Sequence, residues 1–120
     1  MSEEIAVITG EELAHKLDVQ PPANDSRHGG YALVNVLPED MYRKAHIPDS
    51  INIPQGREEE FERRFDREKE IIVYCASPEC QASPKAARAL VARGFHHVVD
   101  YADGLSEWKA AGHPVAAQPR

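Results

Sequence analysis

The chain alternates between short apolar runs and segments with helical or broken patterns. Nearly continuous apolar runs predict strands at 5–8, 31–36, 71–75 and 96–100, with a short extended piece at 50–53. Helices are predicted near 10–17, 38–42, 55–65, 84–94 and 104–110. Because strands alternate with helices, the pattern predicts an α/β domain with a mainly parallel sheet.

Local signals at the ends of these segments refine the prediction. Thr9 is followed three residues later by Glu12, which is a capping-box signature for a helix beginning near Gly10. Residues 20–30 are rich in proline, glycine, asparagine and aspartate, so we expect a flexible, solvated loop there. Residues 116–120 are expected to form a loose tail. The whole chain, 1–120, is interpreted as a single domain.

Composition and charge narrow the function classes. The 120 residues include 14 Lys and Arg against 20 Asp and Glu, a net charge of −6, which argues against a general nucleic-acid binder. No apolar run approaches a membrane span, and no export signal opens the sequence. Two cysteines are too few for a disulfide framework, and the six histidines show no metal-ligand spacing. We therefore expect a cytoplasmic protein without metal or cofactor, nucleic-acid partner or membrane.

Cys75 lies where chemistry is expected in an α/β protein. It ends the most apolar strand, and Ser83 before Pro84 suits a helix cap followed by the first helical residue. The amino terminus of a helix offers unpaired N–H groups and partial positive charge, which stabilise a thiolate. We therefore expect the pKa of Cys75 to be depressed. The alternative is a buried structural cysteine.

Three segments carry a shared signature over most of the chain. Residues 46–54 read HIPDSINIP, residues 72–75 read IVYC, and residues 102–115 read ADGLSEWKAAGHPV. In order and spacing they resemble the HIPGAINIP motif, the active-cysteine strand and the GGLxxWxxAGxPV segment of rhodanese-like domains. The resemblance implies a five-stranded, mainly parallel sheet flanked by helices on both faces. It also implies sulfurtransferase chemistry, with Cys75 carrying sulfane sulfur as a persulfide.

The loop after Cys75 departs from the usual form of that family, roughly C-R-x-G-x-R-S, and resembles a variant branch with a longer, two-cysteine loop. It is two residues longer and contains no arginine or glycine. Pro78 lacks an N–H group, and Glu79 adds negative charge, so we expect thiosulfate to be a poor donor. The candidate substrate-contacting residues are Ala76, Ser77, Pro78, Glu79, Cys80, Gln81, Ala82 and Ser83.

Other positions have open roles. Cys80 is either a resolving or relay thiol for Cys75 or a small residue that packs in the loop. Asn35 and Leu37 stand where the family usually has Asp and Arg, so Asn35 is either a polar contact near the site or a hydrogen-bonded structural amide. Lys85 either balances a bound anion or Glu79, or is simply exposed.

The resulting hypothesis is a sulfurtransferase that passes sulfane sulfur through a Cys75 persulfide to a thiol or another nucleophile. The partner would be a small sulfur-containing substrate or a persulfide-carrying protein. Two alternatives stay open: a non-catalytic rhodanese-like binding or regulatory module, and a thiol–disulfide or persulfide relay between Cys75 and Cys80. A related cysteine-loop phosphatase is disfavoured, because no arginine follows Cys75 until Arg88, inside the predicted helix.

Overall fold

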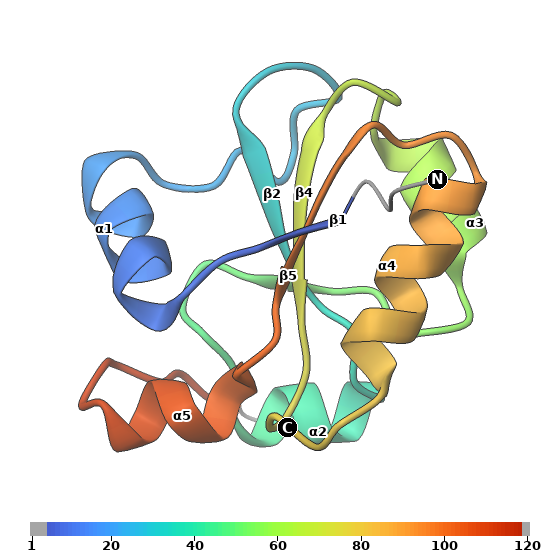
Figure 1. The fold of residues 1–120 in the computed structure, drawn as a ribbon. Coiled ribbons are helices and arrows are strands. Elements are labelled where there is room, and N and C mark those ends of the chain that lie inside the picture. Colours follow the sequence, from blue (N-terminus) through green and yellow to red (C-terminus); the bar gives the residue numbers. More distant parts are fainter. Residues whose placement is uncertain (1–4, 119–120) are drawn as a thin grey trace.

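One parallel sheet forms the centre of the molecule. The computed structural model describes residues 5–118 and orders the strands β1-β5-β4-β2-β3 (Figure 1). The strands are β1 Ile5–Val7, β2 Tyr31–Asn35, β3 Ile51–Asn52, β4 Glu70–Tyr74 and β5 His97–Tyr101. Every neighbouring pair in this sheet is parallel, which confirms the predicted fold class.

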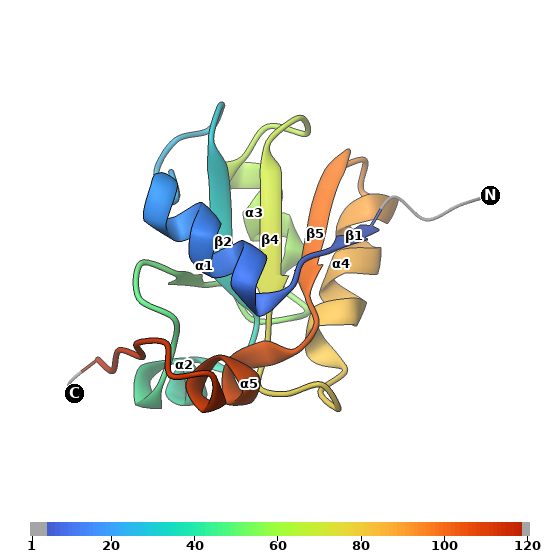
Figure 2. The ribbon, with the colours of Figure 1, turned by 60° about the vertical axis from the view of Figure 1, so that its left-hand side comes forward.

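Helices cover both faces of the sheet and one of its ends. They are α1 Gly10–Val19, α2 Glu39–Lys44, α3 Glu58–Arg64, α4 Ala82–Ala92 and α5 Gly104–Ala110. Figures 1 and 2 show α3 and α4 on one face and α1 on the other, with α2 and α5 near the carboxyl ends of the strands. Within residues 5–118, none of these helices has the length and apolar character needed to span a membrane.

The capping-box prediction is confirmed, whereas two predicted helix starts are wrong. Thr9 Oγ1 accepts from Glu12 N and Glu12 Oε1 accepts from Thr9 N, so α1 begins at Gly10. Helix α3 begins only at Glu58, because Gly56 has a φ of +101° that interrupts a helical run from residue 55. Helix α4 begins at Ala82, with Pro84 third; a proline in the first turn loses no helical hydrogen bond.

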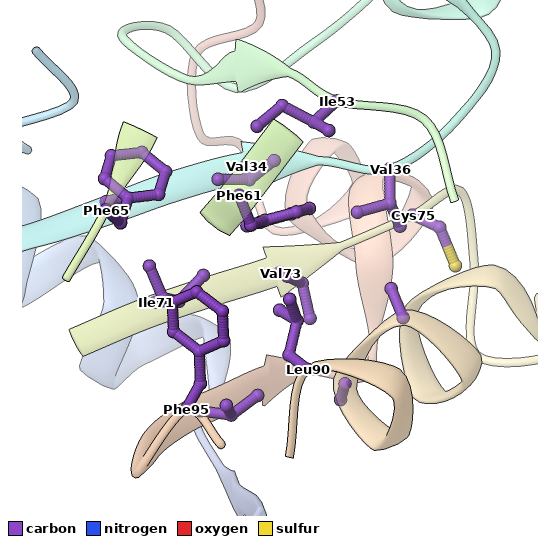
Figure 3. Packing of buried hydrophobic residues seen from close by; sticks show 14 of the residues in the cluster. Val34, Val36, Ile53, Phe61, Phe65, Ile71, Val73, Cys75, Leu90 and Phe95 are labelled. Atoms are coloured by element: carbon purple, nitrogen blue, oxygen red, sulfur yellow. The ribbon is translucent and has the colours of Figure 1, made fainter. Parts of the chain in front are cut away.

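Two apolar clusters hold the layers together. Phe61 of α3, Phe65 directly after it and Leu90 of α4 pack on Val73 and Ile71 of β4 (Figure 3). On the opposite face, a second cluster joins α1, α5 and the sheet through Leu13, Leu33, Ile72, Tyr74, Tyr101 and Trp108. The near-continuous apolar strands are thus buried on both faces, as their pattern predicts.

The HIPDSINIP segment is a scaffold for the carboxyl end of the sheet. The buried Tyr74 hydroxyl accepts from Ile47 N at 2.9 Å and lies 2.8 Å from Ser50 Oγ. Asn52 Nδ2 donates to the carbonyl oxygens of Asn35 and Leu37. These bonds tie the segment to the carboxyl ends of β2 and β4.

The loop at 20–30 and the carboxyl-terminal tail are connected to the rest of the fold. The buried Lys69 Nζ donates to the carbonyl oxygens of Ala23, Ser26 and Gly29. In the tail, Ala116 pairs with His46 in an isolated antiparallel bridge. The flexibility expected for 20–30 and the loose character expected for 116–120 stay predictions, and residues 119–120 lie outside the described range.

Candidate active site

The two cysteines share the loop that joins β4 to α4, at the carboxyl edge of the sheet. Cys80 N donates to Ser77 O at 3.1 Å, which closes a turn with Pro78 at its second position. The second position of such a turn donates no hydrogen bond within the turn, so Pro78 fits there although it lacks an N–H group. Among residues 5–118, Asp49 is the one non-glycine residue with a positive φ, so the loop needs no glycine of its own.

The sulfur atom of Cys75 lies beneath the first turn of α4. Cys75 is only 1% exposed, and its Sγ accepts from Ser83 N at 3.4 Å. Figure 3 shows the sulfur pointing away from the apolar cluster and toward the start of α4. The prediction that Ser83 caps this helix is wrong: Gln81 is the N-cap, without a side-chain cap bond, and Ser83 is buried inside the first turn.

The expected depression of the Cys75 pKa is also wrong. Burial raises the pKa of Cys75, and a hydrogen bond with Cys80 raises it further, against the smaller lowering effect of Ser83. For Cys80, burial acts to raise the pKa. The hydrogen bond from Cys75 and the N–H groups of Ala76, Ala82 and Ser83 outweigh burial and lower the pKa of Cys80. Of the two thiols, Cys80 is therefore the one that ionises more readily.

The connection between β5 and α5 is hydrogen-bonded to the start of the cysteine loop. Leu105 N donates to Cys75 O at 2.9 Å, and Ser106 N donates to Ala76 O at 2.8 Å. The approach requires Gly104, with φ of +78°, because a Cβ atom there would lie 2.6 Å from Ser77 N. The GGLxxW-like segment therefore holds the loop in place through backbone contacts, while Trp108 is buried in the core as expected.

Of the other residues predicted for the site, Asn35 is buried and several lie at the surface. Asn35 is fully buried, and its Oδ1 accepts from Leu37 N at 2.9 Å. Its Nδ2 meets no acceptor at full hydrogen-bond geometry in the described part of the chain. The interpretation as a hydrogen-bonded structural amide therefore holds for Oδ1 and not for Nδ2. Pro78, Glu79, Gln81 and Lys85 are exposed, and Glu79 and Lys85 form no ion pair with each other within residues 5–118.

Comparison with known proteins decides the family. Residues 13–111 match the rhodanese-like domain. The chain belongs to this family. It is 27% identical over 116 residues to thiosulfate sulfurtransferase GlpE of Coxiella burnetii, covering 97% of this chain and 94% of that protein. It is 34% identical over 87 residues to the HTH-type transcriptional regulator Rv0324 of Mycobacterium tuberculosis, covering 72% of this chain but only 38% of the regulator.

Solved structures agree with this membership. The crystal structure of the BH2092 protein from Bacillus halodurans superposes with a TM-score of 0.78 at 26% identity, over 93% of this chain and 77% of that one. The crystal structure of the Alr3790 protein from Anabaena superposes with a TM-score of 0.79 at 21% identity, over 94% of each chain. This second likeness is one of fold. The chain therefore has a rhodanese-like fold, and its cysteine loop contains no arginine.

Asp100 is a buried acid beside the loop that the sequence interpretation missed. Asp100 is 6% exposed, and its Cα pairs in register with Val73 of β4. Cys75 follows Val73 by two residues, so the side chains of Asp100 and Cys75 both point to the α4 face of the sheet. Burial raises the pKa of Asp100 against a lowering hydrogen bond with Ser83, and Oδ1 meets no partner among residues 5–118. The sequence did contain a signal for Asp100, because it is an acidic residue at an inward-facing position of an apolar strand.

Replacing Asp100 by asparagine tests its ionisation in the folded state. Its pKa in the fold lies above the ordinary value of 3.8, so ionisation destabilises the fold at neutral pH and not below pH 3.8. The free energy of unfolding of Asp100→Asn, relative to wild type, is therefore expected to increase from about pH 3.5 to about pH 7. Urea denaturation at both pH values measures it, with the exposed Asp25→Asn as control. A relative stability that falls over this range would contradict the assignment.

Proposed function

We propose that the chain is a sulfurtransferase. It takes sulfane sulfur from a small sulfur-containing substrate or a persulfide-carrying protein, holds it as a persulfide on Cys75, and passes it to a thiol or another nucleophile. Membership of the rhodanese-like family supports the reaction class, as do relatives named thiosulfate sulfurtransferase and putative sulfur carrier protein, the latter from Bacillus subtilis. The cytoplasm is the proposed setting, since thiols stay reduced there.

The observation that carries the proposal is the position of Cys75 Sγ under the first turn of α4. Ser83 N already donates to this sulfur, and the N–H groups of Ala82 and Ser83 also interact with the neighbouring Cys80. The outer sulfur of a persulfide would extend from Sγ into this group of donors, which favours its anionic form. A depression of about 340 Å³ lined by Ala45, Ala76, Leu105, Ser106 and Lys109 borders the loop and offers room for a substrate.

The donor preference follows from the charge of the loop. Thiosulfate carries two negative charges, and the loop meets them with exposed Glu79 and with no arginine. A persulfide donor such as glutathione persulfide is therefore expected to react faster than thiosulfate, although relatives of the chain are named for thiosulfate. Replacing Glu79 by arginine is expected to raise the thiosulfate rate about tenfold.

Steady-state rates with both donors check this prediction. Glu59→Arg is the matched control, because it makes the same change of charge at an exposed position of α3. Neither donor rate is expected to change in the control. Thiosulfate as the faster wild-type donor, together with no effect of Glu79→Arg, would overturn the electrostatic account of the loop.

A regulatory module is the second candidate function. The likeness to a transcriptional regulator, of which the matched part is only 38%, favours it, because the matched part there is one portion of a larger protein. In that case the loop would bind a partner and carry no sulfur. Intact mass distinguishes the two functions: a sulfurtransferase loses its bound sulfur when an acceptor thiol is added, whereas a pure binding module takes up no sulfur from any donor.

A further inference from the structure

The two sulfur atoms of the loop differ in their access to solvent. Cys75 is 1% exposed and belongs to the apolar cluster between the sheet and α4. Cys80 is partly exposed and only borders that cluster. A thiol that takes sulfur from a donor must approach the donor's S–S bond directly, so in this conformation only Cys80 is accessible to an external donor.

Backbone contacts keep Cys75 in its buried position. The carbonyl oxygens of Cys75 and Ala76 accept from Leu105 N and Ser106 N, and Gly104 packs against the same peptide units. Exposing Cys75 would require these bonds to break. The segment around Cys80 is held by its turn bond to Ser77 O, and its neighbours Glu79 and Gln81 are exposed. The outer half of the loop is therefore the part that meets a substrate.

The charge distribution favours the same order. Cys80 has the lowered pKa, with Cys75 and loop N–H groups donating to it, while burial and Cys80 raise the pKa of Cys75. The thiolate is the attacking form, so the accessible cysteine is also the one that ionises more readily. In a sulfur exchange the thiol of lower pKa is the better leaving group, and the thiol of higher pKa is the stronger nucleophile once ionised.

We propose that Cys80 is the residue through which sulfur enters the site, and that Cys75 then receives the sulfur from Cys80 and stores it. This inference rests on the proposed function, in which the stored species is the Cys75 persulfide. It assigns to Cys80 a catalytic contact with the donor, which differs from both a resolving thiol and a packing residue. The natural donor is a persulfide, because its S–S bond presents an accessible sulfane sulfur of low charge.

The steps balance without an external oxidant or reductant. The Cys80 thiolate attacks the outer sulfur of a donor persulfide R–S–SH; the donor S–S bond breaks, Cys80–S–SH forms and R–S⁻ leaves. The departing R–S⁻ takes a proton from solvent, and the Cys75 thiol loses its proton to solvent by way of its hydrogen-bond partner Cys80. The resulting Cys75 thiolate attacks the outer sulfur of Cys80–S–SH, so that Cys75–S–SH forms and the Cys80 thiolate is restored. The second step is directed inward because Cys80 is the better leaving group.

Single-cysteine variants test the order of these events. Cys75→Ser, whose hydroxyl can still donate to Cys80, is expected to gain one sulfur atom from glutathione persulfide within a fewfold of the wild-type rate. Cys80→Ser and Cys80→Ala are expected to load Cys75 at least about tenfold more slowly. Rapid quenching followed by intact mass and mapping of the loop peptide measures both rates, and thermal melting verifies that each variant is folded.

Each outcome has a separate meaning. Faster loading of Cys75→Ser than of both Cys80 variants supports entry through Cys80. Equal rates, or rapid loading of Cys75 in the Cys80 variants, would overturn this inference and leave the proposed sulfurtransferase intact. In the wild type, sulfur found first on Cys75 in the earliest quenched samples would also overturn it. Failure of the wild type to take sulfur from any donor would instead overturn the proposed function.

Discussion

Replacing Cys75 and Cys80 together by serine is expected to lower sulfur transfer from glutathione persulfide to an acceptor thiol by at least about a thousandfold. The loop would keep its N–H groups and its turn but lose both sulfur nucleophiles. Because a hydroxyl at neutral pH does not form a persulfide, neither entry nor storage of sulfur could occur. Steady-state rates with an excess of acceptor, corrected for the uncatalysed reaction, measure the loss.

The double variant also tests whether sulfur transfer depends on the two thiols of the loop. The chain has no other cysteine, so any turnover that persists must come from a non-thiol group. Glu59→Arg, on the exposed side of α3, serves as the control for expression and handling and should keep the wild-type rate. A double variant that retains more than about a tenth of the wild-type turnover would show that the loop is not the site of reaction.

Replacing Gly104 by alanine is expected to have the largest structural effect, lowering the free energy of unfolding by about 2–5 kcal/mol. The new Cβ would lie 2.6 Å from Ser77 N and 2.9 Å from Cys75 O, and these are backbone atoms that cannot rotate away. The residue would also keep a φ of +78°, which strains any side chain. Urea denaturation measures the loss, and the same samples should load sulfur more slowly because the peptide after Cys75 is displaced.

Gly112→Ala is the matched control for this substitution. Gly112 has a similar φ of +88°, but a Cβ there would meet nothing within 4 Å. Its replacement therefore carries the cost of the backbone conformation alone, about 1–2 kcal/mol, and should leave sulfur loading unchanged. If Gly104→Ala and Gly112→Ala destabilised the chain equally, the close approach of the β5–α5 connection to the cysteine loop would not be needed for stability.

The sequence was informative wherever structure depends on near neighbours. Short apolar runs and the Thr9–Glu12 pair predicted the strands and the start of α1, because hydrogen bonding and periodicity act within a few residues. The starts of α3 and α4 were misplaced, since Gly56 interrupts one helix and Pro84 is tolerated in the third helical position of the other. The three motif segments indicated the family that residues 13–111 match.

By itself the sequence determined an α/β fold and a cysteine loop at the carboxyl end of the central strand, since both follow from local patterns. The tertiary structure decided which cysteine is buried and which has the lowered pKa. That difference comes from Leu105, Ser106 and the first turn of α4, which meet the loop only after the chain folds. Asp100 and Gly104 gained their roles in the same way. Burial and electrostatic environment depend on such non-local contacts, so pattern and spacing alone could not establish them.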